Sequence, residues 1–270
     1  MSKRLGQHHL KDGAICRPLV DFLRPAGRWV VEVGPGGGVL TRELLAGGAR
    51  VAALELDRAW AFALRHRQAV EPTVAEPGGL DRLAIACVDA LEIDWSALPR
   101  GARIAGNLPY NVATPLIDRA ATQALAVDRM AFLVQLELAQ RLVAEPGQKA
   151  YSAWTAWTAC WASTRILGRV KPGSFRPPPR VDSAFVGLER RGPPLPLAEM
   201  ENLRSTIRAA FSRRRKTLRN ALGSAWGRDA AREALAAAAI EPSRRAETLS
   251  VAEFVALERG RRGPPSQVVD

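Results

Sequence analysis

The sequence predicts an α/β domain with a seven-stranded, mostly parallel, doubly wound sheet, followed by a small all-helical C-terminal domain. Short apolar runs rich in β-branched residues alternate with helical patterns through the first 190 residues, and beyond them the pattern is helical throughout. Seven of these runs are typical of strands, and they lie at 29–33, 50–56, 83–88, 103–107, 129–135, 164–170 and 181–189.

The last two predicted strands differ from the first five because only the Pro/Gly-rich stretch "KPGSFRPPPR" separates them. They can therefore pair as an antiparallel hairpin that completes the sheet. After them, the segment "RRGPPLPLAEM" combines charge with three prolines, which indicates a linker. We therefore expect two domains, at 1–190 and 191–270.

The charge balance favours a polyanionic partner. The chain has 39 Lys and Arg against 27 Asp and Glu, a net charge of +12, and such a surplus is common in proteins that bind nucleic acids. Charge alone does not distinguish RNA, DNA and anionic lipid. The density of positive charge is highest in 191–270, where half of the surplus falls in less than a third of the chain.

The sequence gives no sign of a membrane span, a secretory signal or a metal site. No apolar run approaches the roughly 18 residues that a span needs, and the N-terminus lacks the apolar middle of a signal peptide. We therefore expect a cytoplasmic protein. Cys16, Cys87 and Cys160 are isolated and the three histidines show no metal-ligand spacing, so we expect neither a disulfide nor a bound metal.

The stretch "VVEVGPGGGVLTREL" follows a predicted strand and opens a predicted helix. Gly34, Gly36 and Gly38 let the backbone turn tightly and approach a ligand closely. Glu55, 21 residues after Gly34, ends the next strand, where a carboxylate can accept hydrogen bonds from ribose hydroxyls. This spacing predicts an adenosine-type cofactor, and Val39 in place of a third spaced glycine disfavours a nicotinamide dinucleotide. The alternative is a tight turn with a surface glutamate.

Asp89 closes the third predicted strand and stands at the same carboxyl edge of the sheet. Its carboxylate can accept a hydrogen bond from the amino group of an adenine. An isolated aspartate at this place can equally cap the start of a helix. The residue type alone leaves both interpretations open.

The stretch "RIAGNLPYNVATPLI" places Asn107, Leu108, Pro109 and Tyr110 after the fourth predicted strand. The exocyclic amine of a nucleobase is a poor nucleophile, and acceptors for its N–H bonds favour the pyramidal nitrogen that reacts. The Asn107 side-chain oxygen and the Leu108 carbonyl can be those acceptors, while Pro109 fixes the turn and Tyr110 offers a stacking face for an extruded base. A methyl sulfonium beside the glycine loop would then react mainly through orientation. An ordinary turn after a strand is the alternative.

With these residues assembled, the chain resembles the ribosomal RNA adenine N6-dimethyltransferases, a family that includes the KsgA-type small-subunit enzymes and the Erm-type macrolide-resistance enzymes. The matching segments run almost end to end: "RLGQHHL", "EVGPGGGVLT", "LELD", "VDA", "GNLPYNVATPLI", "QRLVAEPGQKAYSAW", "SFRPPPRVDSA", "AFSRRRKTLRNAL" and "EPSRRAETLSVAEF". The resemblance implies a Rossmann-like methyltransferase fold, S-adenosylmethionine as the cofactor, and methylation of N6 of adenosine in ribosomal RNA.

The resemblance also implies a role for individual residues. Contacts with S-adenosylmethionine are implied for His8, Leu10, Gly34, Gly36, Glu55, Asp89 and Asn107. Contacts with the target base are implied for Asn107, Leu108, Pro109, Tyr110 and Phe175. In this arrangement the Phe175 ring stacks on the base opposite Tyr110.

The C-terminal segments resemble the small-subunit branch more than the resistance branch. We therefore expect dimethylation of two adjacent adenosines near the 3′ end of the small-subunit RNA, with the immature small subunit as partner and the protein acting as a monomer. Three alternatives stay open at this point. They are a large-subunit enzyme that confers macrolide resistance, an RNA-binding assembly factor with impaired catalysis, and an oxidoreductase.

The N-terminal segment departs from the family pattern. The family usually has Gln-Asn-Phe-Leu where this chain has Gln7, His8, His9 and Leu10. A neutral imidazole at His8 can replace the donor and acceptor of the amide. His9 loses apolar packing area, which puts the closure of this segment over the cofactor in question, and both histidines can also be solvated residues of a mobile arm.

The range 204–219 holds seven basic residues and no acidic one. Spread around a helix, they suit binding of RNA by its shape and phosphates, although a solvated charged face is the common alternative. The expected RNA-binding residues are Arg213, Arg214, Arg215, Lys216 and Arg219. Trp154, Trp157 and Trp161 share one helix face, and we expect them to be core residues rather than a surface that stacks on bases.

Overall fold

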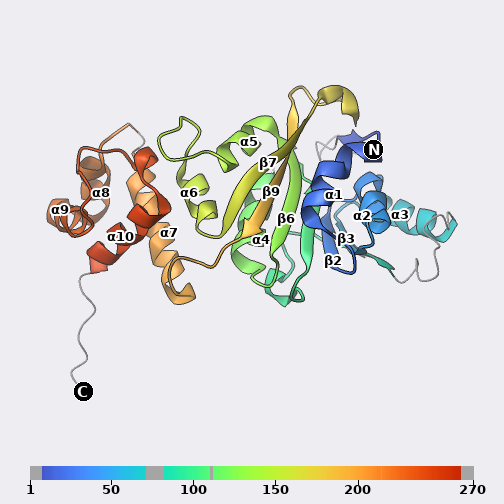
Figure 1. Cartoon of the computed structure of the whole chain (residues 1–270), viewed down its shortest axis with the longest axis horizontal. Coiled ribbons are helices and arrows are strands. Elements are labelled where there is room, and N and C mark those ends of the chain that lie inside the picture. The colour runs from blue at the N-terminus through green and yellow to red at the C-terminus, as the bar shows by residue number, and fades with distance from the viewer. Residues whose placement is uncertain (1–7, 71–81, 110–111, 214, 263–270) are drawn as a thin grey trace, which may run out of the picture. The chain divides into compact units, whose positions relative to one another are not determined.

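The structure is a computed structural model, and it describes residues 8–70, 82–109, 112–213 and 215–262 of the chain (Figure 1). Internal contacts divide the chain into two compact units. The first consists of Met1–Gln140 and Ser163–Arg190, and the second of Arg141–Ala162 and Arg191–Asp270. The N-terminal end of the helical segment falls where the linker was predicted, but residues 141–162 differ from the predicted division because they belong to the second unit.

The first unit contains the predicted seven-stranded sheet, which confirms the fold class. Its strand order is β4-β3-β2-β5-β6-β9-β7. The first five strands in this order are parallel to one another, and β9 is antiparallel to β6. The strands are β2 (Trp29–Val33), β3 (Arg50–Glu55), β4 (Leu83–Cys87), β5 (Arg103–Asn107), β6 (Arg129–Gln135), β7 (Ala162–Val170) and β9 (Ser183–Arg190).

The order of the strands reverses beside β2. The chain runs outward from β2 through β3 to β4, then returns to β5 on the other side of β2 and continues to β6. In an open α/β sheet, ligands bind in the crevice at the carboxyl ends of the strands where the order reverses. The residues that follow β2 and β5 therefore face that crevice.

Helices cover the central strands on both faces. All four residues Arg103–Gly106 of β5 are buried, as are Met130–Val134 of β6, which requires apolar neighbours on either side of the sheet. A core cluster joins Leu19 of the first helix and Leu44 of the second to Val51 of β3. The helices of this unit are η2 (Gly13–Cys16), α1 (Arg17–Leu23), α2 (Val39–Ala46), α3 (Arg58–Val70), η5 (Trp95–Ala97), α4 (Ala113–Gln123), α5 (Leu136–Leu142) and η6 (Pro172–Ser174).

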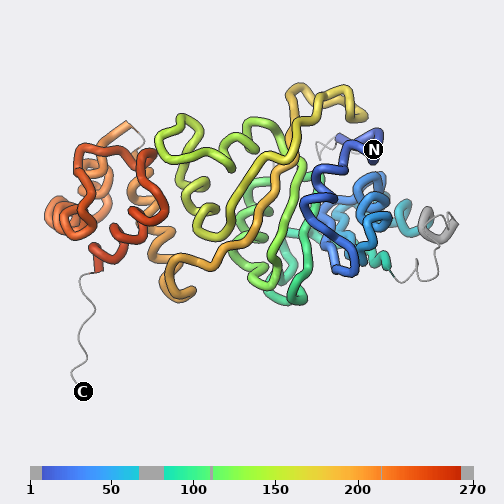
Figure 2. The backbone as a smooth tube through the Cα atoms, in the orientation of Figure 1, coloured from blue at the N-terminus to red at the C-terminus, as the bar shows by residue number. Residues whose placement is uncertain are grey.

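A two-stranded sheet ties the N-terminal arm to a distant part of the same unit. Strand β1 (His9–Leu10) pairs antiparallel with β8 (Phe175–Arg176), so that His9 lies opposite Arg176 and Leu10 opposite Phe175. Figure 2 shows the arm, in dark blue, running beside the yellow segment that carries β8. Beyond the pairing, the Lys11 amide donates to the Ser174 carbonyl at 3.0 Å.

The second unit is helical, and Arg141–Ala162 is part of it for a physical reason. The Tyr151 hydroxyl donates to the Leu249 carbonyl at 3.0 Å, and its ring packs near Phe211. Apolar contacts of this kind between distant segments leave no local pattern in the sequence. The helices are α6 (Ala153–Ala159), α7 (Leu197–Phe211), α8 (Leu218–Trp226), α9 (Arg228–Ala237), η7 (Ala246–Thr248) and α10 (Val251–Arg262).

Two expectations for the second unit have different outcomes. Trp157 and Trp161 are buried and contact each other edge to face, as expected of core residues, whereas Trp154 is only partly buried. The three do not share one helix face, because α6 ends at Ala159, before Trp161. The basic range 204–219, in contrast, is not one helix, because α7 ends at Phe211 and α8 begins at Leu218. None of the described helices combines the length and apolar character that crossing a membrane requires.

Candidate active site

The glycine loop leaves β2 in a conformation that only glycine adopts without strain. Gly34, Gly36 and Gly38 have φ of +68°, +50° and +75°. Gly38 precedes α2, whose start has no side-chain cap, so the first N–H groups of this helix have no partner within it. Such a helix start favours a ligand that offers acceptor atoms or negative charge.

Glu55 braces this loop from the end of β3. Its Oε2 accepts from the Gly36 amide at 3.0 Å, and its Oε1 accepts from the Asp57 amide at 2.9 Å. The side chain is buried. Each carboxylate oxygen has a second lone pair, so Glu55 can still accept from a pair of ligand hydroxyls. The sequence-based picture of a surface glutamate beside a simple turn is therefore wrong.

Asp89 lies at the same sheet edge as Glu55, since the Val88 amide donates to the Glu55 carbonyl at 3.0 Å. The Asp89 carboxylate caps its own turn, with Oδ1 accepting from the Leu91 amide at 2.8 Å. No described residue donates to Oδ2. Both interpretations of this aspartate are thus compatible with its geometry, because one oxygen closes the turn and the other is open to a ligand.

Asn107 is held in one orientation by the N-terminal arm. Its Nδ2 donates to the His8 carbonyl at 2.8 Å. A carbonyl oxygen can only accept, so the amide nitrogen must face His8 and the amide oxygen must face the other way. Within the described part of the chain, nothing donates to that oxygen. The Asn107 side-chain oxygen therefore has a fixed orientation and is available to accept a hydrogen bond from a ligand.

The turn after Asn107 fixes a second acceptor. The Leu108 amide donates to the Leu133 carbonyl at 3.0 Å, which anchors the turn on β6. The Pro109 carbonyl accepts from Val112 and Ala113 and starts α4. The Leu108 carbonyl accepts from no described residue. Tyr110, the expected stacking residue, lies outside the described residues.

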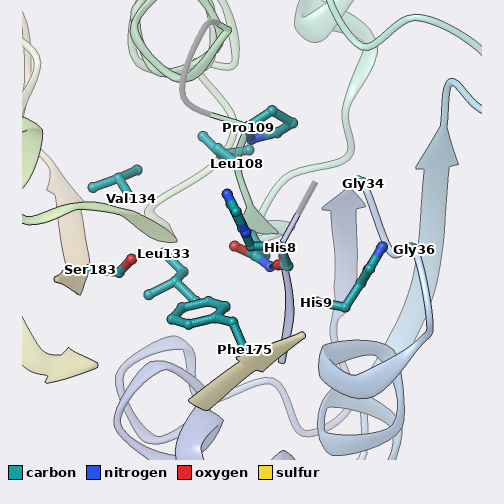
Figure 3. A pocket seen from close by; sticks show the side chains of 11 residues that line it. His8, His9, Gly34, Gly36, Leu108, Pro109, Leu133, Val134, Phe175 and Ser183 are labelled. Carbon is teal, nitrogen blue, oxygen red and sulfur yellow. Dashed lines mark hydrogen bonds between the residues drawn. The ribbon is translucent and has the colours of Figure 1, made fainter. Parts of the chain in front are cut away.

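These elements surround one cavity, shown in Figure 3. The glycine loop contributes one wall, the turn after β5 another, and the arm with β8 a third. The space left between the side chains is about 40 Å³, close to the volume of one water molecule. The cavity is lined by His8, His9, Gly34, Gly36, Asn107, Leu108, Pro109, Leu133, Val134, Phe175 and Ser183.

The arm closes over the loop in spite of its two histidines. The His9 ring packs on Trp60 with 4.8 Å between ring centres, and a Cβ added at Gly36 would lie 2.7 Å from it. His8 Nδ1 lies 2.8 Å from the Pro177 carbonyl. Both histidines are half-buried, so the alternative of solvated residues on an arm is wrong. Burial lowers the pKa of His9, against the opposing effect of the Glu55 carboxylate.

Phe175 and Leu10, which face each other across the two-stranded sheet, complete the part of the site that the arm covers. Phe175 is 1% exposed and belongs to the core cluster of the unit, while one part of its ring faces the cavity (Figure 3). Leu10, its partner across the two-stranded sheet, lines a smaller neighbouring cavity.

Glu32 is a candidate functional residue that the sequence analysis did not single out. It lies on β2 and is 1% exposed, and its Oε2 has no partner among the described residues. It lines the smaller cavity together with Gly34 and Asn107. Burial raises the pKa of this carboxyl to about 7 against the opposing effect of the nearby Thr41 hydroxyl, which does not reach hydrogen-bonding geometry, and the Glu55 carboxylate adds to the rise. An acidic residue inside the apolar run "VVEVG" was the available signal.

A family model for ribosomal RNA adenine dimethylases matches residues 1–259. The chain belongs to the ribosomal RNA adenine dimethylase family. A curated relative from Mesorhizobium japonicum, named ribosomal RNA small subunit methyltransferase A, is 42% identical over 273 residues, which cover 94% of this chain and 91% of the relative. The membership confirms the resemblance seen in the sequence and rejects the oxidoreductase alternative.

Two solved structures show the same fold. A dimethyladenosine transferase from Plasmodium falciparum superimposes with a TM-score of 0.77 at 22% identity, over 93% of this chain and 96% of that chain. The 23S rRNA methyltransferase ErmE superimposes with a TM-score of 0.72 at 24% identity, over 94% of this chain and 99% of that chain. At these identities the likeness concerns the architecture alone.

The residues present fit S-adenosylmethionine, the cofactor of this adenine dimethylase family. The strongest observation is the buried Glu32 Oε2 without a hydrogen-bond partner among the described residues, beside a loop in which Gly36 and Gly38 have no space for a Cβ. An ammonium group is the natural partner of such an oxygen. When bound, the cofactor supplies a methyl group on a sulfonium, and two buried carboxylates nearby suit its positive charge.

The expected RNA-binding residues lie on the second unit. Arg213, Arg215 and Lys216 are exposed in the connection between α7 and α8, and Arg219 is exposed on α8. Arg214 lies outside the described residues. The sequence therefore located the basic residues but misjudged the element that carries them.

Proposed function

We propose that the protein transfers methyl groups from S-adenosylmethionine to N6 of adenosines in the RNA of the small ribosomal subunit. The observation that carries this proposal is the Asn107 amide, whose oxygen is oriented by the His8 carbonyl and lies in one cavity with the glycine loop. A methyl acceptor bound at Asn107 is thereby held beside a methyl donor bound at Gly34 and Gly36.

On the cofactor side, each residue has a distinct task. Glu55 accepts from the ribose hydroxyls, as its remaining lone pairs permit, and the free oxygen of Asp89 accepts from the adenine amino group. Glu32 pairs with the ammonium of the methionine part. The amides at the start of α2 and of the glycine loop hold the polar atoms of that part.

On the substrate side, the Asn107 oxygen and the Leu108 carbonyl accept the two N6–H bonds of the target adenosine. These two hydrogen bonds draw the nitrogen toward a pyramidal shape and free its lone pair for attack. As the nitrogen gains positive charge, the same two oxygens stabilise it until a proton leaves to water. Phe175 packs against the base, and orientation accounts for most of the acceleration.

The small subunit is the preferred target because of the curated relative. It is named a small-subunit enzyme and is 42% identical over 94% of this chain, whereas ErmE shares 24% and only the fold. We further propose that two adjacent adenosines near the 3′ end of the small-subunit RNA each receive two methyl groups. In this proposal the protein acts as a monomer on the immature subunit in the cytoplasm.

The experiment uses purified protein, labelled S-adenosylmethionine and small ribosomal subunits that lack the modification. Digestion of the RNA and mass spectrometry should then find N6,N6-dimethyladenosine in the small-subunit RNA and none in large-subunit RNA treated alike. Methylation of the large-subunit RNA instead would favour the resistance-type activity. The absence of any N6-methylated adenosine would reject the proposal.

A further inference from the structure

His8 brings an imidazole to a position of the active-site cavity where the family pattern has the amide of an asparagine. Both side chains can donate and accept hydrogen bonds. An imidazole can in addition take up a proton near neutral pH, which an amide cannot. In Figure 3 the His8 side chain extends into the cavity toward Leu108. The substitution therefore adds a base to the site.

The contact with Pro177 determines which nitrogen of the His8 ring carries the proton. Nδ1 lies 2.8 Å from the Pro177 carbonyl oxygen, and a carbonyl oxygen can only accept a hydrogen bond. Nδ1 is therefore the N–H donor, and in the neutral ring the lone pair is on Nε2. The two ring nitrogens point in different directions, so this lone pair faces away from Pro177. The ring is thus held in the tautomer that can accept a proton at Nε2.

The backbone of His8 is tied to the substrate side of the cavity. Its carbonyl accepts from Asn107 Nδ2 at 2.8 Å, and its side chain lines the same cavity as Asn107 and Leu108. The residue that orients the Asn107 amide therefore also places an imidazole beside it. A general base must lie within hydrogen-bonding reach of the proton that it takes. The tie to Asn107 keeps His8 near the two oxygens that the proposed function assigns to the N6 amine.

The other titratable groups near the cavity lie on the cofactor side or cannot accept a proton. His9 is the only other titratable side chain among the described lining residues, and its ring packs against the glycine loop. Glu32 and Glu55 also lie at that loop. Lys11 on the arm and Arg176 on β8 add positive charge, and neither has an acceptor atom in its side chain.

We propose that His8 is the general base of the methyl transfer, with Nε2 accepting the proton that the N6 amine releases. The inference rests on the proposed function and deepens it, since it names the group that takes this proton.

The proposed step balances in atoms and electrons. The N6 lone pair forms the bond to the methyl carbon, and the carbon–sulfur bond breaks with its electron pair left on sulfur. One N6 proton passes to His8 Nε2, because the Asn107 and Leu108 oxygens are too weakly basic to keep it. The imidazolium then gives the proton to water, while Nδ1 stays hydrogen-bonded to Pro177. Each transfer releases one proton, so His8 acts once for every methyl group.

The first test determines the tautomer of His8 in the absence of catalysis. Long-range proton–nitrogen correlation spectra of the nitrogen-labelled full-length protein distinguish a protonated ring nitrogen from an unprotonated one. The signals that are missing in His8→Asn belong to His8. At pH 8 we expect a protonated Nδ1 and an unprotonated Nε2. A His8 ring with its proton on Nε2 overturns the proposal.

The second test measures the single-turnover rate of methylation between pH 5 and 9, with saturating small subunits and S-adenosylmethionine. Histidines change charge within this range. We expect the wild-type rate to fall as the pH decreases and to be lower in deuterated water, because a proton moves during the reaction. His8→Asn should be about 10²-fold slower at pH 8, the lower end of the usual contribution of general base catalysis. It should also lose the solvent isotope effect and most of the pH dependence.

Two control variants isolate the role of His8. His66→Asn makes the same chemical change on α3, where the side chain is exposed and lies outside the cavity lining. Its rate and pH profile should equal those of the wild type. His9→Phe removes the other histidine of the lining, and it should keep both the pH dependence and the isotope effect because the base is still present.

The outcomes separate a failure of this inference from a failure of the proposed function. If His8→Asn methylates with the rate, pH profile and isotope effect of the wild type, His8 is not the base and the proposed function stands. The same holds if calorimetry shows only weaker cofactor binding by His8→Asn, with an unchanged rate at saturation. If the wild type methylates no adenosine at any pH, the proposed function fails and the base assignment fails with it. Thermal unfolding verifies that each variant is folded.

Discussion

At the scale of single residues, the site depends on which way one amide faces. The His8 carbonyl fixes the Asn107 nitrogen, so the oxygen is left to accept a hydrogen bond, which the proposed function assigns to the N6 amine. A side chain without that oxygen can still leave the turn intact, because Leu108 and Pro109 are anchored through their backbone atoms. If the proposed function holds, we therefore expect the amide to contribute to catalysis far more than to stability.

We expect Asn107→Ala to lower the single-turnover rate of methylation by about 10²-fold, the usual effect of removing one aimed hydrogen-bonding group from an active site. The free energy of unfolding should change by less than about 1 kcal/mol. Rapid-quench measurements with saturating RNA and cofactor give the rate. The matched control is Gln123→Ala on α4. It also removes a side-chain amide, but one that is exposed and lies outside the cavity. Equal rates for the two variants would refute the assigned role.

Glu32 makes a second prediction at this scale, through its titration. The pKa of the carboxyl is about 7 in the folded protein against 4.5 as its ordinary value. Because the folded state holds this proton more tightly, the stabilisation is fully present below pH 4.5 and is lost as the pH rises to about 7. We expect the cofactor-free protein to lose up to about 3 kcal/mol of stability over this window relative to Glu32→Gln.

Urea unfolding of both proteins between pH 4 and 8 measures this difference. Calorimetry in buffers of different ionisation enthalpy should also detect release of a proton when S-adenosylmethionine binds near pH 7, since its ammonium favours the charged carboxylate. If the stability of the wild type and of Glu32→Gln changes with pH in the same way, the pKa of Glu32 is not raised in the folded protein and the prediction is wrong.

At the scale of elements, we expect the N-terminal arm to move when ligands enter the site. It pairs with β8 through two residues and leaves space for little more than a water molecule beside Asn107. The packing of the His9 ring on Trp60 holds it down. A ligand that enters the site therefore has to displace the arm, which few contacts hold in place. Pairings of only two residues open readily.

The arm should open at low pH because of His9. Burial lowers the pKa of this residue below 6.5, so the closed arm favours the neutral ring and its stability is lost as the pH falls through the lowered pKa. We expect the protection of the Lys11 amide, corrected for its intrinsic exchange rate, to fall between pH 7 and 5. His9→Phe, which restores the usual family residue, should keep its protection. Hydrogen exchange read by NMR measures both, and equal profiles would contradict the prediction.

The sequence predicted the strands well because each is a short buried run bounded by turn residues, and all seven lie within two residues of the expected ends. The glycine loop and the turn at Asn107 were recognisable because their chemistry is local. Glu32 was missed since the lack of a partner for its oxygen follows from burial by residues far along the chain. The prediction of one basic helix was wrong because α7 ends at Phe211 and α8 begins at Leu218, so a short connection divides the range.

At the scale of the whole molecule, the chain enters the helical unit, leaves it and returns. Arg141–Ala162 belongs with the C-terminal helices, so no single cut separates the two units. Local periodicity could not reveal this, because Tyr151 and Trp157 look like core residues of any domain until their neighbours in α7 and near Leu249 are known.

We expect a fragment that ends at residue 190 to be aggregation-prone, since it retains Tyr151, Trp157 and Trp161 without the helices that bury them. Size-exclusion chromatography and binding of a hydrophobic dye measure this. Addition of the separately expressed segment 191–270 should restore a soluble complex. A monodisperse, dye-negative fragment would show that residues 141–162 fold with the sheet instead.

The central claim is that donor and acceptor share the cavity between the glycine loop and the turn after β5. A crystal structure of the protein with S-adenosylmethionine and an adenosine-containing RNA fragment tests it most directly. The account predicts the adenosine N6 within hydrogen-bonding distance of both the Asn107 oxygen and the Leu108 carbonyl, with the cofactor on Gly34, Gly36 and Glu55. An adenosine bound elsewhere, with Asn107 contacting neither ligand, would contradict it.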